Sequence, residues 1–356
     1  MPKCSYCMGG PFVGRSGPKH TPRRSAGKPG RPPVDRSGSG RYRGRSRGGE
    51  MDVLMTGGTG LIGQTLIPLL LERGDRVTVV TRDANRVRQT LPTGAEPLEA
   101  DPAVVGPWLD HATRADAIVN LVGESVATGF WTRGKKRRLR RSRLRPTSHL
   151  ADVLRDRDPE RPAVLVSASA TGYYGDGGEQ ALGEAAEPGQ DYLAMLCYEW
   201  ERNAQRAAGP GCRVAMTRFG LVLAREGGAL AAMRPAFERG LGGRLGSGRQ
   251  YWPWVHIQDV ARAILFVIDT PGIAGPVNVT APNPAQQREF ARLLGEALDR
   301  PTRLPAPAWA LRLVLGQKAA ILLASQRAVP NRLKTSGFTF EHVELERALD
   351  DLIGPR

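Results

Sequence analysis

From residue 51 onward, short apolar runs alternate with longer stretches in which apolar residues recur at helical spacing. The apolar runs are rich in β-branched residues and are expected to be strands at 52–56, 76–80, 117–121, 163–167, 213–217 and 277–279. Nearly continuous apolar strands are typical of a sheet that helices cover on both faces. The pattern therefore predicts an α/β fold, built on a doubly wound parallel sheet.

A glycine-rich loop joins the first expected strand to a helix expected over 61–73. Gly57 permits a tight turn, Gly60 lets the backbone approach a pyrophosphate, and Gly63 lets helix and strand pack closely. Backbone N–H groups at the start of a helix bind phosphate. The loop therefore predicts a Rossmann-type dinucleotide site, with contacts from Gly57, Gly58, Gly60, Leu61, Ile62 and Gly63.

The residues that end the second strand bear on which dinucleotide binds. An acid at that position accepts the ribose 2′-OH of NAD, whereas a cation suits the 2′-phosphate of NADP. The chain has Arg82 there, followed by Asp83. Arg82 favours NADP as the cofactor, and Asp83 keeps NAD as the alternative.

Beyond about residue 223 the alternation gives way to glycine-rich loops and to helices expected over 285–298 and 308–323. We expect an NAD(P)-binding domain over 51–225, to which 254–280 returns. The segments 226–253 and 281–352 are expected to form a smaller, C-terminal substrate-side lobe. A helix over 260–268 should follow Asp259, which is either its N-cap or an acid of its first turn.

The net charge of +16 is unevenly distributed. Residues 1–50 hold 12 Lys or Arg and 2 acids, and they are rich in Gly, Pro and Ser. We expect this segment to be a disordered basic leader, or translation to start at Met51. Residues 133–145 hold nine basic residues and no acid. A helix whose charges mostly face water is expected there; without interleaved aromatic residues, nucleic-acid binding is not favoured.

The cysteines give no sign of a metal site or a disulfide framework. Cys4 and Cys7 form a C-x-x-C with only His20 nearby, which is too few ligands for tetrahedral zinc. Cys197 and Cys212 are expected to be isolated thiols. No window of about 18 apolar residues occurs, so no membrane span is expected and the cytoplasm is the expected compartment.

Several motifs further along the chain point to one family. They are Asn120-Leu121-Val122-Gly123-Glu124, Trp131 with Lys135, Ser142-Arg143, the run from Ser167 to Gly175, Glu199-Trp200-Glu201 and the run from Trp254 to Asp259. With the glycine spacing and the tail from Arg300 to Phe338, the chain resembles atypical extended short-chain dehydrogenases/reductases. This subgroup is called epimerase family, or sugar-nucleotide epimerase-like, and carries a C-terminal domain of unknown function.

The resemblance implies which residues contact cofactor and substrate. Besides the glycine loop and Arg82, it implies cofactor contacts from Leu121, Gly123 and Ser167. Lys135, in the basic stretch, and His256, in the turn before the helix at 260–268, are candidate substrate contacts. A half-buried structural histidine is the alternative for His256.

The resemblance also implies a catalytic Ser, Tyr and Lys, in which the Lys lowers the pKa of the Tyr. Ser169 aligns with the serine and Tyr192 lies near the tyrosine, but Leu196 and Cys197 stand where the lysine is expected. Tyr173, or Tyr174 beside it, is the candidate substitute as acid or base; the alternative is that both tyrosines only line the pocket.

The resemblance implies an NADP-dependent oxidoreductase or epimerase acting on a small hydroxylated substrate such as a nucleotide-sugar. The missing lysine favours an alternative, an NAD(P)-binding protein with little or no catalysis that acts through partners. A homodimer is a further candidate state.

Overall fold

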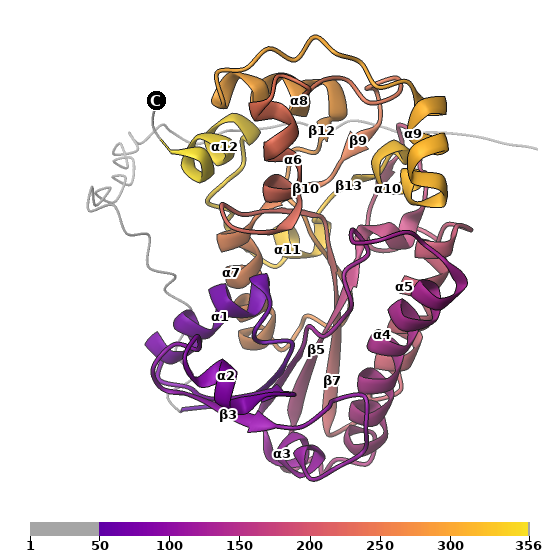
Figure 1. The fold of residues 1–356 in the computed structure, drawn as a ribbon. Helices are drawn as coiled ribbons and strands as arrows, with labels where there is room; N and C mark the ends of the chain where they lie inside the picture. The colour runs from indigo at the N-terminus through magenta and orange to yellow at the C-terminus, as the bar shows by residue number, and fades with distance from the viewer. Residues whose placement is uncertain (1–49, 355–356) are drawn as a thin grey trace, which may run out of the picture. The chain divides into compact units, whose positions relative to one another are not determined.

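The computed structural model describes residues 50–354, and a parallel sheet of seven strands forms its centre (Figure 1). The strand order is β11-β7-β5-β4-β1-β2-β3. The strands are β1 (Asp52–Thr56), β2 (Arg76–Thr81), β3 (Ala95–Glu99), β4 (Ala117–Asn120), β5 (Ala163–Ala170), β7 (Cys212–Phe219) and β11 (Gly275–Val279). This order confirms the doubly wound α/β fold. The expected leader and the Cys4–Cys7 pair lie outside the described residues.

Helices cover both faces of the sheet (Figure 1). Helices α3, α4 and α5 pack together on one face, and α1 and α7 pack together on the other. Their bounds are α1 (Leu61–Glu72), α3 (Trp108–Arg114), α4 (Arg133–Leu154), α5 (Tyr192–Gln205) and α7 (Ile257–Asp269), with the short α2 (Ala84–Arg88) after β2. The carboxyl ends of the strands therefore meet at one edge, where loops carry the candidate site.

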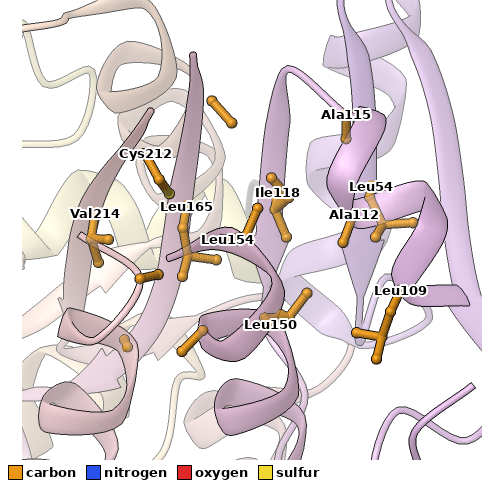
Figure 2. Close-up of a cluster of buried hydrophobic side chains, with 14 of the residues drawn as sticks. Leu54, Leu109, Ala112, Ala115, Ile118, Leu150, Leu154, Leu165, Cys212 and Val214 are labelled. Carbon is orange, nitrogen blue, oxygen red and sulfur yellow. The ribbon is translucent and has the colours of Figure 1, made fainter. Parts of the chain in front are cut away.

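A hydrophobic cluster between the sheet and α4 holds this face together (Figure 2). Ile118 and Leu165 project from neighbouring strands toward Leu150 and Leu154 of α4, and all four are fully buried. Leu150 and Leu154 are four residues apart, so they lie on the same face of the helix. The apolar strand pattern of the sequence is thus used on both sides of the sheet.

A second hydrophobic cluster lies in the C-terminal part of the chain. It joins α6 (Gly228–Glu238), α8 (Gln287–Ala297) and α12 (Leu345–Ile353) around Trp252, Trp254 and Phe290. Short strand pairs border it: β8 (Leu221–Leu223) with β10 (Trp254–His256), β9 (Tyr251–Trp252) with β12 (Ala285–Gln286), and β6 (Ala181–Leu182) with β13 (Arg327–Ala328). The separate cluster agrees with a smaller lobe, whose boundaries stay a prediction.

Three elements differ from the sequence-based expectation. Helix α4 continues past Pro146 because the buried side chains beyond it outweigh the lost N–H bond. The helix expected over 308–323 breaks at Gly316, which has φ of +55°, into α9 (Ala308–Leu315), a 3-10 turn and α10 (Ala320–Leu323). Strand β3 was not expected, since its polar residues and Pro97 suit only a sheet edge. A last short helix, α11 (Asn331–Thr335), precedes α12.

None of the helices in the described residues combines the length and the apolar character that crossing a bilayer requires.

Replacing Leu150 by Ala should remove side-chain contacts from the centre of the first cluster. Because the site is fully buried, we expect a loss of about 2 to 5 kcal/mol in the free energy of unfolding, measured by urea denaturation. Leu313→Ala, at a side chain that is 79% exposed, is the matched control and should change it by less than about 0.5 kcal/mol. Equal effects of the two substitutions would contradict the assigned core.

Candidate functional site

Glycines shape the turn between β1 and α1 because neighbouring backbone leaves no space for side chains. Gly57 has φ of +72°, and a Cβ atom there would lie 2.7 Å from the Leu121 carbonyl carbon after β4. A Cβ on Gly63 would lie 2.3 Å from the Gly58 carbonyl oxygen. These are the turn and the close packing expected of the two glycines.

The start of α1 is open to a ligand. Gly60 is the N-cap and supplies no side-chain hydrogen bond to the first turn. The N–H groups of Leu61, Ile62 and Gly63 therefore lack a capping acceptor from a side chain in the described residues. Such a helix start carries a partial positive charge and fits a phosphate.

A cleft of about 940 Å³ opens beside this turn. Of the expected cofactor residues, Gly57, Arg82 and Gly123 line it. These three come from the ends of β1, β2 and β4, which are neighbours in the sheet. Other residues that line the cleft are Thr59, Asp83, Arg86, Glu124, Arg138, Arg141 and Ser142. The cleft therefore presents backbone together with charged side chains of both signs, and its arginines outnumber its acids.

The structure separates the parts played by Arg82 and Asp83. Asp83 is the N-cap of α2, and its Oδ1 accepts a hydrogen bond from the Arg86 N–H at 2.9 Å. Its carboxylate is thus used within the protein. The exposed Arg82 lines the cleft beside it. In the described part of the chain, the Arg82 guanidinium is therefore free to meet a ligand in the cleft, whereas the Asp83 carboxylate is hydrogen-bonded to the first turn of α2.

A buried polar network lies behind the turn and includes Ser167. The Thr56 hydroxyl donates to Asn120 Oδ1 at 2.7 Å, and Asn120 Nδ2 donates to Ser167 Oγ at 3.2 Å. Asn120 Nδ2 also donates to Thr147 Oγ1, which accepts from the Trp200 indole as well. Ser167 is fully buried, so the network joins the ends of β1, β4 and β5.

Ser169, near the end of β5, belongs to a second buried network. Its hydroxyl donates to Glu201 Oε1 at 2.6 Å. Arg218 of β7 holds the same carboxylate with two hydrogen bonds, from Nε at 2.8 Å and from Nη2 at 2.7 Å. Because Ser169 gives its proton to Glu201, its oxygen can act toward a ligand only as an acceptor.

The two candidate tyrosines lie in different surroundings. The Arg218 guanidinium stacks 3.5 Å from the ring centroid of Tyr173. Tyr192 is the first residue of α5, and its hydroxyl donates to the Lys136 carbonyl oxygen at 3.0 Å. Burial raises the pKa of both phenols above the ordinary value. Both tyrosines therefore stay protonated at neutral pH.

Lys135 is buried, and its ammonium group is paired within the protein. Its Nζ lies 2.7 Å from Glu124 Oε1 and donates to Thr128 at 3.2 Å. The hydrogen bond from Lys135 lowers the pKa of Glu124. Lys135 thus fixes Glu124, which lines the cleft, and does not line the cleft itself.

His256 lies outside the residues that line the cleft and is the N-cap of α7. Its Nδ1 accepts from the Gln258 N–H at 3.2 Å, and its ring stacks on His342 with centroids 3.6 Å apart. Its Nε2 lies 3.2 Å from Asp351 Oδ2. Asp259, in the first turn of α7, accepts the N–H groups of Glu341 and His342. This group ties α7 to the C-terminal segment.

Sequence reasoning missed the pair of Glu201 and Arg218. Both are nearly fully buried, and their nearest side-chain atoms lie 2.7 Å apart. One signal was available, because an arginine within the apolar run of β7 requires a buried partner. The sequence could not name that partner, which lies on a different element.

Comparison with known proteins matches this chain to epimerase family proteins. Residues 53–279 match the NAD dependent epimerase/dehydratase family, and residues 306–352 match a domain of unknown function, DUF1731. The chain is 38% identical over 305 residues to the epimerase family protein SDR39U1 homolog, chloroplastic, of Arabidopsis thaliana, covering 84% of this chain and 86% of that protein. It is 40% identical over 299 residues to epimerase family protein MT2273 of Mycobacterium tuberculosis, covering 83% and 96%.

Solved structures give the same result. Human epimerase family protein SDR39U1, determined with NADPH, matches with a TM-score of 0.74 and 32% identity, over 85% of this chain and 99% of that one. A nucleoside-diphosphate sugar epimerase from Corynebacterium glutamicum matches with a TM-score of 0.68 and 28% identity, over 86% of this chain and 59% of that one.

The buried His256 predicts a loss of stability in mild acid. Burial lowers the pKa of His256 to about 4, with His342 adding to the effect and Asp351 and Asp259 opposing it. Because the unfolded chain takes up the proton near pH 6.5, stability is full above that pH and falls as the pH drops toward 4. We expect a loss of about 2 kcal/mol between pH 7 and pH 5 from this residue.

His256→Asn keeps a side-chain acceptor for the Gln258 N–H but cannot titrate. Urea denaturation at several pH values should show a smaller decline for this variant than for the wild type. His111→Asn, at an exposed histidine, is the control and should leave the decline unchanged. A decline that His256→Asn does not reduce would contradict the assignment.

Proposed function

The chain belongs to the NAD-dependent epimerase/dehydratase family, and from this premise we propose that it binds NADP(H) in the cleft and acts as an oxidoreductase or epimerase. The proposed substrate is a small hydroxylated molecule of the nucleotide-sugar class. One observation carries the cofactor proposal: a single cleft is lined both by the turn before α1, at Gly57 and Thr59, and by Arg82, while Asp83 caps α2.

The residues of the cleft fit the phosphates of NADP. The first-turn N–H groups of α1 would hold the pyrophosphate, and the glycines leave space for its approach. Arg82 would hold the 2′-phosphate, with Arg86 on the same cleft wall. When bound, the cofactor would supply hydride transfer at C4 of the nicotinamide.

Ser169 is proposed to orient the substrate. With its proton given to Glu201, the Ser169 oxygen would accept a hydrogen bond from a substrate hydroxyl. The bidentate pairing with Arg218 holds the Glu201 carboxylate, and this fixes the direction of the Ser169 hydroxyl. The serine would therefore recognise a hydroxyl better than a carbonyl.

The tyrosines are proposed as proton donors. Since burial keeps Tyr192 and Tyr173 protonated at neutral pH, either phenol can give a proton to the alkoxide that forms when a carbonyl of the substrate is reduced to the hydroxyl. Neither is a good base for the reverse reaction. Tyr192 currently donates to a backbone carbonyl, so its hydroxyl would have to exchange that acceptor for the substrate. The nucleotide-sugar class is supported by the named activity of the Corynebacterium glutamicum protein.

A second candidate is a cofactor-binding protein with little or no catalysis. The expected lysine position favours this candidate. Leu196 and Cys197 are buried there, and neither carries the positive charge of a lysine. Burial raises the pKa of Cys197 to about 12, so its thiol carries no charge at neutral pH. Screening nucleotide-sugars for NADP-dependent turnover separates the two candidates.

Removing Arg82 should weaken the binding of NADPH much more than the binding of NADH. A charge-assisted contact to the 2′-phosphate is lost in Arg82→Ala, so we expect NADPH affinity to fall at least 10-fold and NADH affinity to change less than 2-fold. Fluorescence titration measures both. Arg88→Ala, on the same short helix but not lining the cleft, is the control. A similar loss for both cofactors would refute the role of Arg82.

Removing the Ser169 hydroxyl should slow turnover without affecting cofactor binding. With a nucleotide-sugar that the screen finds active, Ser169→Ala should lower kcat/KM at least 100-fold, because the substrate hydroxyl loses its acceptor. NADPH affinity should stay within 2-fold of the wild type. Ser336→Ala, at an exposed serine, is the control. Undiminished turnover in Ser169→Ala would remove this residue from the mechanism.

A further inference from the structure

Arg143 of α4 is a half-buried cation that lies directly behind the cleft. A Cβ on Gly123 would lie 3.1 Å from its Cζ, so the guanidinium packs against the backbone of that glycine. Its other contact is the ring of Trp200, with the centroid 5.1 Å from Cζ. Gly123 lines the cleft and Arg143 does not, so the guanidinium lies behind the backbone of this glycine.

Arg143 is half-buried, yet it makes no salt bridge among the described residues, whereas the buried Lys135 nearby has one. Lys135 pairs with Glu124, and Arg140 pairs with Glu199 at 2.7 Å. The hydrogen bond that Arg143 makes within the described residues runs from Nη1 to the Leu139 carbonyl oxygen at 3.2 Å. A guanidinium has five N–H donors, so most of them remain available for a ligand.

Burial makes this arrangement costly for the folded protein. It lowers the pKa of Arg143, because the loss of hydration outweighs the opposing effects of Cys197, Tyr192 and Glu124. Oxygen atoms of a ligand in the cleft would offset that cost by accepting the unused donors. Arg143 is therefore better explained as a ligand-binding residue than as part of the helix surface.

The sheet order indicates which half of the dinucleotide Arg143 faces. Arg82 follows β2, the glycine turn follows β1 and Gly123 follows β4, and these strands are consecutive in the sheet. A dinucleotide with its 2′-phosphate at β2 and its pyrophosphate at β1 extends its other half toward β4 and β5. Trp200, the second contact of Arg143, lies on α5, which packs against β5.

The same region lacks the lysine of the tyrosine motif. Leu196 and Cys197 occupy that part of α5, and Arg143 is an electrostatic neighbour of both Tyr192 and Cys197. We propose that Arg143 supplies the cation that α5 lacks, and that its guanidinium donates hydrogen bonds to the ribose hydroxyls of the nicotinamide half of the cofactor. This inference rests on the proposed binding of NADP(H).

The test compares NADPH with adenosine 2′,5′-bisphosphate, which carries the 2′-phosphate but lacks the nicotinamide half. Calorimetric titration of Arg143→Gln should show about 10-fold weaker NADPH binding and unchanged binding of the bisphosphate. Arg82→Ala should weaken the binding of both ligands. Arg145→Ala, at an exposed residue of the same helix, is the control and should change neither.

The outcomes separate this inference from the function on which it rests. Failure of the wild type to bind either ligand overturns the proposed function itself. Wild-type binding together with equal effects of Arg143→Gln on the two ligands, or no effect, overturns only the role of Arg143. If Arg143→Gln does not fold, Arg143→Met decides by the same comparison, since methionine fills a similar length but has neither the charge nor the donors. Selectively weaker NADPH binding by Arg143→Met then supports the inference, and unchanged NADPH binding overturns it.

Discussion

Close backbone packing at the start of α1 is the constraint on which the candidate site depends. At Gly63 the helix packs against the backbone of Gly58, and at Gly57 the chain turns against the backbone that follows β4. A Cβ atom at either glycine would clash with that backbone. The first-turn N–H groups of α1 therefore have no side-chain cap, and Gly57, Thr59 and Gln64 around them line the cleft. The sheet, in turn, places Arg82 and Gly123 on either side of this turn.

Buried polar side chains fix the strand ends behind this cleft. Asn120 joins β1, β4 and β5, and the pair of Glu201 and Arg218 joins α5 to β7. A buried ion pair is expensive to desolvate, and the bidentate geometry and the extra hydrogen bond from Ser169 offset that cost. Rigid groups of this kind position a reacting hydroxyl, which agrees with the proposed role of Ser169.

The sequence predicted the features that depend on nearby residues and missed those that depend on distant ones. The glycine turn and most strands follow from local spacing, whereas β3 is a polar edge strand held by pairing with β2. The sequence left the choice between Arg82 and Asp83 open. Both line the cleft, but Asp83 caps α2, and this favours Arg82 as the residue that meets the cofactor. The partners of Glu201 and His256 lie on other elements, so no local pattern could name them.

The proposed site combines a helix start that would bind phosphate with Arg82, which would select NADP, and α5 lacks the lysine that the family resemblance implies. The most direct test is a crystal structure of the protein with NADPH. The account predicts the pyrophosphate at the first-turn N–H groups of α1 and the 2′-phosphate within hydrogen-bond distance of Arg82. A cofactor bound with its 2′-phosphate elsewhere, or a cleft that takes up no NADPH at saturating concentration, would contradict it.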